Sequence, residues 1–151
     1  EAELEVPFAV LFGQALIDLK LEGEAGAIAL RVALLSPYLE AAARRMTPTG
    51  PQEAFLVALA KGDPTLVVPP DSMARAIMAA YRNPALPAEG QALIDGNRPG
   101  EAILLAIDSI GRGVQGDLRG VTDGLSLLRA AGLSAMARRT ALELMILERR
   151  G

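Results

Sequence analysis

The stretch from Gly23 to Pro37 reads GEAGAIALRVALLSP and decides the fold class of this chain. Alanine and leucine fill it, and both are among the best helix formers. Proline disfavours the helical conformation of the residue before it, so Ser36-Pro37 predicts a kink or the end of this helix. Strand-favouring β-branched and aromatic residues are sparse elsewhere too, and glycine and proline separate further Ala/Leu-rich blocks.

This punctuation predicts an all-α chain of about eight short helices. Pro7 is expected at the start of the first helix, and Asp71 or Ser72 and then Ser134 are expected to cap later ones. We expect helices at 7–20, 23–35 with a continuation or new helix to 46, 51–61, 72–82, 87–95, 101–110, 117–131 and 135–149, and an extended connector at 64–70.

The sequence also echoes itself at an offset of 77 residues. Gln14-Ala-Leu-Ile-Asp18 recurs as Gln91-Ala-Leu-Ile-Asp95, and Gly23-Glu-Ala25 recurs as Gly100-Glu-Ala102. The offset is close to half of 151 residues. It favours one all-α domain over 1–151 with an internal duplication of a four-helix unit, 7–82 and 87–150. Coincidence in a chain of low diversity is the alternative.

Short paired helices that stack on their neighbours bury a continuous core, which is the architecture of an α-solenoid. The sequence therefore predicts stacked helical hairpins and resembles the general class of helical repeat proteins. Its residues match none of the tetratricopeptide, ankyrin or HEAT patterns, so no named family follows from the resemblance.

The composition excludes several kinds of chemistry. The chain has no cysteine and no histidine, so it lacks a thiolate nucleophile, a disulfide, an imidazole base and the usual zinc ligands. We expect no cofactor, no metal and no catalytic residue set. A net charge of −3 with 3% aromatic residues argues against nucleic-acid binding. Nearly all basic residues are arginine, which fits a GC-rich bacterial genome as well as any function.

The mean hydropathy of +0.30 is high for a soluble domain. The best apolar run, from Val6 to Ile17, is interrupted by Pro7 and Gln14 and is shorter than the roughly 20 residues of a membrane span. We expect a soluble chain without a transmembrane segment, in the cytoplasm or the periplasm. The apolar excess predicts a protein partner or self-association. Glu1 is not a start methionine, so the sequence is compatible with a mature or truncated piece.

Two motifs suggest chemistry at first sight. Residues 111–116 spell G-x-G-x-x-G, which binds dinucleotides only when it follows a strand and opens a helix. Here it follows a predicted helix, so a flexible link between helices is the better interpretation.

The echoed carboxylates are the second motif. If they converge to within about 5–10 Å, they could hydrolyse a glycoside or hold a hard cation. The plainer interpretation is favourable negative charge in first helical turns and at helix ends. The four residues are Asp18, Glu24, Asp95 and Glu101.

A last group of residues could contact a partner. Basic doublets can bind an anionic group, and an exposed tyrosine can anchor an interface, although solvated arginines and a tyrosine at the core edge are equally ordinary. These interaction candidates are Tyr38, Tyr81, Arg44, Arg45, Arg138 and Arg139.

The function that these features favour is a non-catalytic helical module for protein–protein interaction or scaffolding. One alternative is an enzyme, or the helical domain of one, that uses the four carboxylates on a sugar or metal. The other is a carrier of an apolar ligand in an Ala/Leu-lined cavity.

Overall fold

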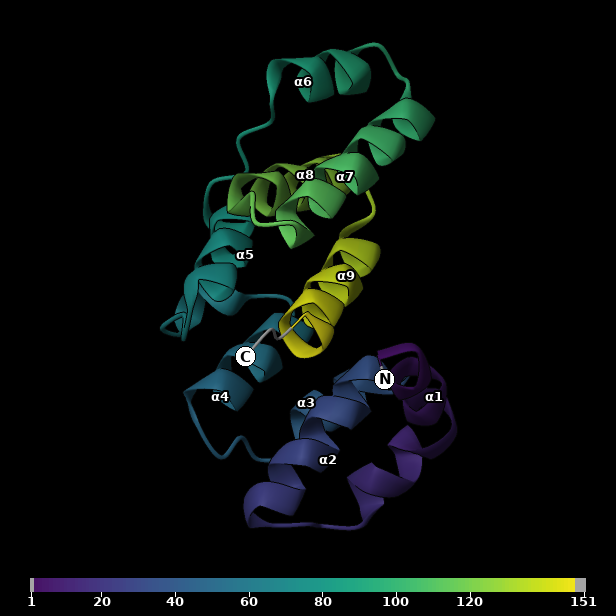
Figure 1. The fold of residues 1–151 in the computed structure, drawn as a ribbon, viewed down its shortest axis with the longest axis vertical. Coiled ribbons are helices and arrows are strands. Elements are labelled where there is room, and N and C mark those ends of the chain that lie inside the picture. The colour runs from purple at the N-terminus through teal and green to yellow at the C-terminus, as the bar shows by residue number, and fades with distance from the viewer. Residues whose placement is uncertain (1, 149–151) are drawn as a thin grey trace.

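The computed structural model describes residues 2–148, with side chains from residue 4 onward. Over that range the chain forms nine α-helices, one 3₁₀ turn and no strand, which confirms the all-α fold (Figure 1). The elements are α1 (Ala2–Asp18), α2 (Gly23–Leu35), α3 (Leu39–Arg45), α4 (Pro51–Ala60), η1 (Pro64–Leu66), α5 (Ser72–Arg82), α6 (Ala88–Asp95), α7 (Pro99–Val114), α8 (Leu118–Ala130) and α9 (Ser134–Leu147).

The helices stack along one long axis. In Figure 1, α1, α2 and α3 form the lower end, and α6 lies at the upper end over the beginning of α7. Neighbouring helices pack as in a helical bundle or a solenoid, with α1 against α2 and α7 against α8 as the most extensive contacts. The last helix, α9, returns to the middle and packs on α2, α4, α5 and α8. It thereby joins the two ends of the stack.

The core is built mainly from alanine and leucine. Phe55 is the only aromatic residue among the buried side chains of the described chain. Twelve of the thirty buried hydrophobic residues are alanines, including Ala33, Ala60 and Ala137, which lie on three different helices. Small side chains leave little volume between helix axes, so the helices approach one another closely.

Glycines bring the backbones of α7 and α8 into direct contact. Because α7 continues to Val114, the prediction of a flexible link at 111–116 is wrong. A Cβ atom on Gly113 would lie 2.9 Å from the backbone nitrogen of Val121, and one on Gly124 would lie 2.7 Å from the carbonyl oxygen of Ala106. α7 therefore runs through most of the G-x-G-x-x-G motif. Close packing across the interface outweighs the low helix propensity of glycine.

Three other predicted boundaries are corrected. Pro7 lies inside α1, because the helix-forming residues before it extend the helix and the missing N–H removes only one bond near its start. The N-cap of α9 is Leu133, and Ser134 is its first helical residue. Residues 64–66 form a 3₁₀ turn before the connector extends. Asp71 caps α5 as predicted, accepting a hydrogen bond from the Ala74 N–H at 2.8 Å. The predicted helix end near Arg149 lies outside the described residues.

Each of the two echoed segments contains the same local hydrogen bond, from its glutamine to its aspartate. The side-chain amide of Gln14 donates to Asp18 at 3.1 Å, and that of Gln91 donates to Asp95 at 2.7 Å. Each pair closes a helix that is followed by a turn and a second helix. Beyond that hairpin the halves differ, because α2 leads into the short α3 whereas α7 leads into the thirteen-residue α8. The duplication stays a prediction.

Candidate interaction surface

α1 is apolar on two opposite faces, and one of them is turned inward. Ala9, Gly13 and Ile17 are buried at a spacing of four residues, which places them on one side of the helix against α2. A Cβ atom on Gly13 would lie 2.6 Å from the hydroxyl oxygen of Ser36. Glycine at this position therefore lets the backbone of α1 lie directly on the end of α2.

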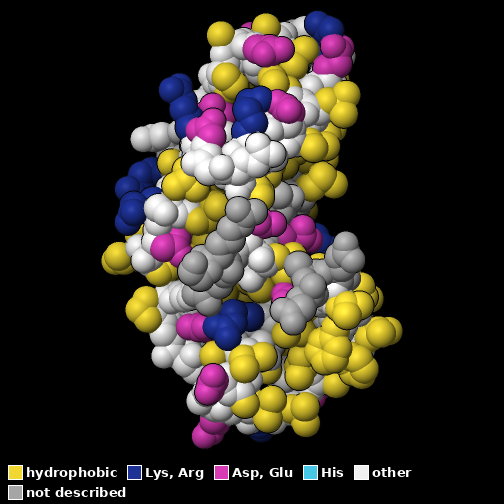
Figure 2. Space-filling model, viewed as in Figure 1, with side chains coloured by type: hydrophobic (Ala, Val, Ile, Leu, Met, Phe, Trp, Pro, Cys, Tyr) yellow, Lys and Arg dark blue, Asp and Glu magenta, His cyan; other side chains and the backbone are white. Residues whose placement is uncertain are grey.

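The bulky apolar residues of α1 face solvent. Leu4 and Leu11 keep 74% and 75% of their surface exposed, and Phe8 and Phe12 each keep 47%. The two phenylalanine rings lie against each other, with centroids 4.7 Å apart. We call these four residues together with the exposed Ala15 the outward face of α1. Figure 2 shows hydrophobic side chains gathered at the lower right, where Figure 1 places this helix.

Charged groups border the outward face only at its ends. Asp18 accepts from Gln14 at 3.1 Å and pairs with Arg45 at 2.8 Å. The hydrogen bond from Gln14 and the neighbouring Arg45 guanidinium hold the pKa of Asp18 below its usual value. Glu5 lies exposed near the other end, and Lys20 follows the helix. The helix between carries no charge from Val6 to Ile17.

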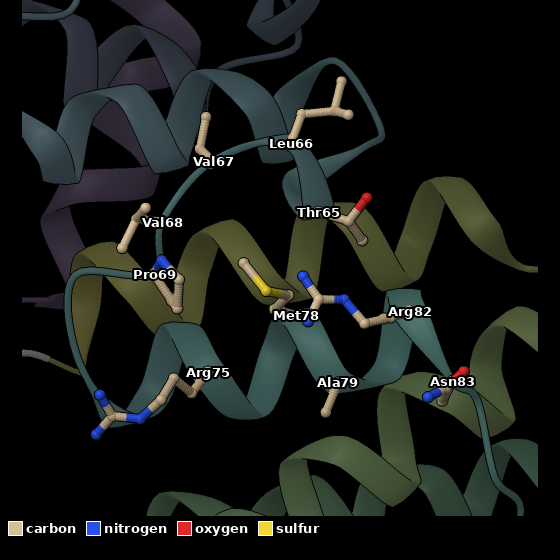
Figure 3. A pocket seen from close by; sticks show the side chains of 10 residues that line it. All are labelled: Thr65, Leu66, Val67, Val68, Pro69, Arg75, Met78, Ala79, Arg82 and Asn83. Atoms are coloured by element: carbon tan, nitrogen blue, oxygen red, sulfur yellow. The ribbon is translucent and has the colours of Figure 1, made fainter.

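A groove of about 580 Å³ lies between α5 and the connector before it (Figure 3). Its connector side includes Leu66 and Val68, each 82% exposed, and its α5 side includes Met78. Arg75 and Arg82 also come from α5, so the lining is apolar and basic and contains no acidic residue. The apolar-carrier alternative predicts an Ala/Leu-lined cavity, whereas this groove is lined by the connector and a basic helix.

A tyrosine and two arginines form a cluster where α4, α5, α8 and α9 meet. The guanidinium of Arg129 lies 4.4 Å from the centre of the Tyr81 ring, and Arg138 donates to the Ala60 carbonyl at 3.0 Å and to Glu40 at 3.0 Å. The Tyr81 hydroxyl is buried without a hydrogen-bond partner among the described residues. Burial raises the pKa of Tyr81, and the two arginine charges oppose this shift. Arg129 donates to the Ala80 carbonyl near the end of α5, as Arg138 does near the end of α4. Both arginines therefore complete helix C-termini, which is a structural task.

The structure brings together two of the six predicted interaction candidates, Tyr81 and Arg138. Tyr38 is 44% exposed at the start of α3, and Arg44 is exposed in the last turn of that helix. Arg45 pairs with Asp18, and Arg139 pairs with Glu143 on its own helix at 3.4 Å. Tyr38, Arg44 and Arg45 therefore lie at the ends of α3, whereas Arg139 lies on α9.

The echoed carboxylates are not gathered in one cleft. Asp18 and Glu24 lie on α1 and α2 at one end of the stack, and Asp95 and Glu101 lie on α6 and α7 at the other (Figure 1). Glu101 is paired locally by Arg98. Within the described residues, no group of three acidic side chains is placed to hold a metal ion.

Sequence reasoning missed the outward face of α1, although a signal for it was present. Between Val6 and Ile17 apolar residues fall on all sides of the helix, and such a helix is normally buried all round. Large side chains at positions 4, 8, 11 and 12 stand opposite the small ones at 9 and 13. Helical periodicity alone does not say which of two apolar faces turns toward the core.

Comparison of the chain with protein-family models, curated proteins and solved structures yields no significant match. Function is therefore inferred from the residues of this chain. Along residues 2–148, no helix has both the length and the apolar character that a membrane crossing demands.

Proposed function

We propose that this chain is a non-catalytic protein–protein interaction module and that it binds through the outward face of α1. The observation that carries the proposal is the solvent exposure of Leu4, Phe8, Leu11 and Phe12 side by side on one helix. Single exposed apolar residues are ordinary, but a contiguous apolar patch on a surface helix marks an interaction site.

The energetics support the same assignment. Burial of apolar surface yields roughly 25 cal/mol per Å², so covering a single exposed leucine or phenylalanine contributes on the order of 1–2 kcal/mol. Four such side chains in one stripe, together with the partner surface that they cover, offset much of the roughly 4–15 kcal/mol that association costs in translational and rotational freedom. Aromatic residues such as the Phe8–Phe12 pair are typical of interface centres.

A helix is the shape that best complements this face. The stripe follows the helix axis. Its four large side chains line neither the groove beside α5 nor the hollow between the end of α1 and residues 45–49. Apolar stripes of this kind pack against a second helix, with side chains at positions i, i+4 and i+7 as anchors. The module is thus expected to recognise an amphipathic or apolar helix.

The experiment compares the wild type with Leu11→Glu by light scattering over a range of protein concentrations. We expect the wild type to associate at micromolar concentration and the variant to remain monomeric, because the substitution puts a carboxylate in the centre of the face. Leu66→Glu is the matched control, since Leu66 is 82% exposed on a different part of the surface. It should associate as the wild type does.

The side chain of Leu11 contributes little to the fold, so the unfolding free energy of Leu11→Glu should stay within about 0.5 kcal/mol of the wild type. A folded wild type that is strictly monomeric at every concentration would overturn the proposal. Equal association of Leu11→Glu and the wild type would also overturn it.

A further inference from the structure

We infer that the helix recognised by the outward face of α1 is α1 of a second copy, packed antiparallel about a twofold axis. This inference rests on the proposed function, whose test already measures self-association, and it adds which helix of the second copy is contacted and in which orientation. Three observations carry it: the spacing of the exposed residues, the distribution of charge along the helix and the amount of apolar surface.

The spacing is that of a helix–helix seam. Leu4, Phe8, Leu11 and Ala15 are separated by four, three and four residues, and all four are exposed. Steps of four and three alternate in the seam of paired helices, because 3.5 residues per turn keep the stripe facing its partner. The buried residues Ala9, Gly13 and Ile17 follow a different stripe on the opposite side of the same helix. α1 is therefore built to pack on two sides, and within the described chain its main contacts are with α2 and α3.

The charges favour a second copy in antiparallel orientation. The face itself is neutral, so it offers no complementarity to a strongly charged partner. In a parallel pair the exposed Glu5 of one copy would lie beside the partner's Glu5, at a cost from like charge. In an antiparallel pair each Glu5 is turned toward the partner's end of α1, where Asp18 is already paired with Arg45 of α3 and Lys20 follows the helix, and the two antiparallel helix dipoles attract each other.

A membrane surface fits less well. Helices that lie in a lipid interface carry lysine and arginine along the polar border of the apolar face, where they meet anionic headgroups. The borders of this face hold no such row: Glu5 lies at one end, Asp18 paired with Arg45 and the single Lys20 lie at the other, and the chain as a whole has a net charge of −3. Anionic lipids would therefore gain little from contact with it.

One antiparallel register uses the whole stripe. If Phe8 faces the partner's Leu11, then Leu4 faces the partner's Ala15, and the twofold axis repeats both contacts. Each pair sets a large side chain against a smaller one, as close packing of two helices requires. A shift by one heptad in either direction leaves half of the stripe uncovered.

The area is adequate for a modest dimer. Leu4, Phe8, Leu11 and Phe12 are half to three-quarters exposed, with Leu19 58% exposed at the end of the stripe. We estimate that about 500 Å² of apolar surface per copy is available for burial, which is below the roughly 800 Å² per partner of a standard interface. We therefore expect a weak dimer, because interfaces below about 1,200 Å² in total are typical of transient complexes.

Cysteine cross-linking tests the geometry cleanly, because the chain has no cysteine of its own. Leu4→Cys and Ala15→Cys are made as separate proteins and equilibrated in a glutathione redox buffer, alone and mixed. In the antiparallel pair, position 4 faces position 15 of the partner. Position 4 of one copy and position 4 of the partner lie about 16 Å apart along the helix axis, since eleven residues rise 1.5 Å each. That distance is too long for a disulfide, and the same holds for position 15. The mixture should form covalent dimers containing one chain of each variant, and neither protein alone should.

A mixture of Leu66→Cys with Ala15→Cys measures cross-linking by random collision, because Leu66 is exposed but lies outside the outward face. Cross-linking of Leu4→Cys alone and Ala15→Cys alone would show a parallel pair and overturn the inference. Cross-linking of the test mixture no higher than that of the collision control would also overturn it. If light scattering still reports association that Leu11→Glu abolishes, the proposed function survives that failure. If the wild type is monomeric, both fail.

Discussion

The guanidinium of Arg138 donates a hydrogen bond to the main-chain carbonyl of Ala60 at 3.0 Å, across 78 residues of sequence. The acceptor is the last residue of α4, whose terminal carbonyls have no partner within the helix. α9 thus completes the C-terminus of α4 with a charged side chain, and the second Arg138 nitrogen pairs with Glu40 on α3. The Arg138 side chain thereby connects α9 with α4 and α3 in the middle of the stack.

The first prediction concerns this contact. Arg138→Ala should lower the free energy of unfolding by about 1–3 kcal/mol, because it leaves a partly buried carbonyl without a donor. Urea denaturation measures the change. Arg139→Ala is the matched control, since its pair with Glu143 is exposed and lies within one helix. The control should change stability by less than about 0.5 kcal/mol. Equal losses for the two neighbours would contradict the role of Arg138.

The second prediction concerns the α7–α8 interface. Gly113→Ala should destabilise the fold by about 1–3 kcal/mol, because the added methyl group meets the backbone of Val121 across the interface. Gly111→Ala lies in the same helix with no atom within 4 Å of the new methyl group. It should stabilise by up to about 1 kcal/mol, as alanine favours the helix more than glycine does. Thermal and urea unfolding of both variants check the opposite signs.

The third prediction concerns pH. Burial raises the pKa of Tyr81 above its ordinary value of 10.0, so the folded state holds the phenolic proton more tightly than the unfolded chain does. The contribution to stability is complete below pH 10 and is lost as the pH rises above it. Tyr81→Phe should remove the part of the loss of stability at alkaline pH that comes from this phenol, and it should change the free energy of unfolding little at neutral pH. Urea unfolding at neutral and alkaline pH tests this, with the exposed Tyr38→Phe as control. A variant that loses stability with pH as steeply as the wild type would contradict it.

The fourth prediction concerns the ion pair between α2 and α4. Arg31 contacts the buried carboxylate of Glu53 at 3.0 Å. Arg31→Met should lower the free energy of unfolding by about 1–3 kcal/mol, because it leaves that carboxylate without its partner. The double variant Arg31→Met with Glu53→Leu should recover much of the loss, since no unpaired charge remains. A double variant as unstable as the single one, measured by urea unfolding, would refute this assignment.

Local signals predicted most of the helices. Pro37, Pro51 and Gly62 interrupt or begin helices through backbone constraints that act on the residue itself. For this reason α2 and α4 lie close to their predicted bounds. The predicted absence of strands also follows from composition, because alanine and leucine replace the β-branched residues that a sheet would need.

Contacts between distant segments could not be predicted in this way. Gly113 reads locally as a break, yet α7 continues through it because Val121 packs where a side chain would have stood. The bond from Arg138 to Ala60 has no local signature at all. The outward face of α1 lies between these cases: its spacing is visible in the sequence, but its exposure depends on where α2 packs. The identity of the candidate site therefore required the fold.

The most direct test of the central claim is amide hydrogen exchange along the chain at high and low protein concentration, because it reports both whether the chain associates and where. We predict that exchange in α1 slows at the higher concentration and that exchange in α5 does not change. The Leu11→Glu variant should show no such dependence. Exchange in α1 that is independent of concentration, or protection that arises elsewhere in the chain, would contradict the assignment of this face.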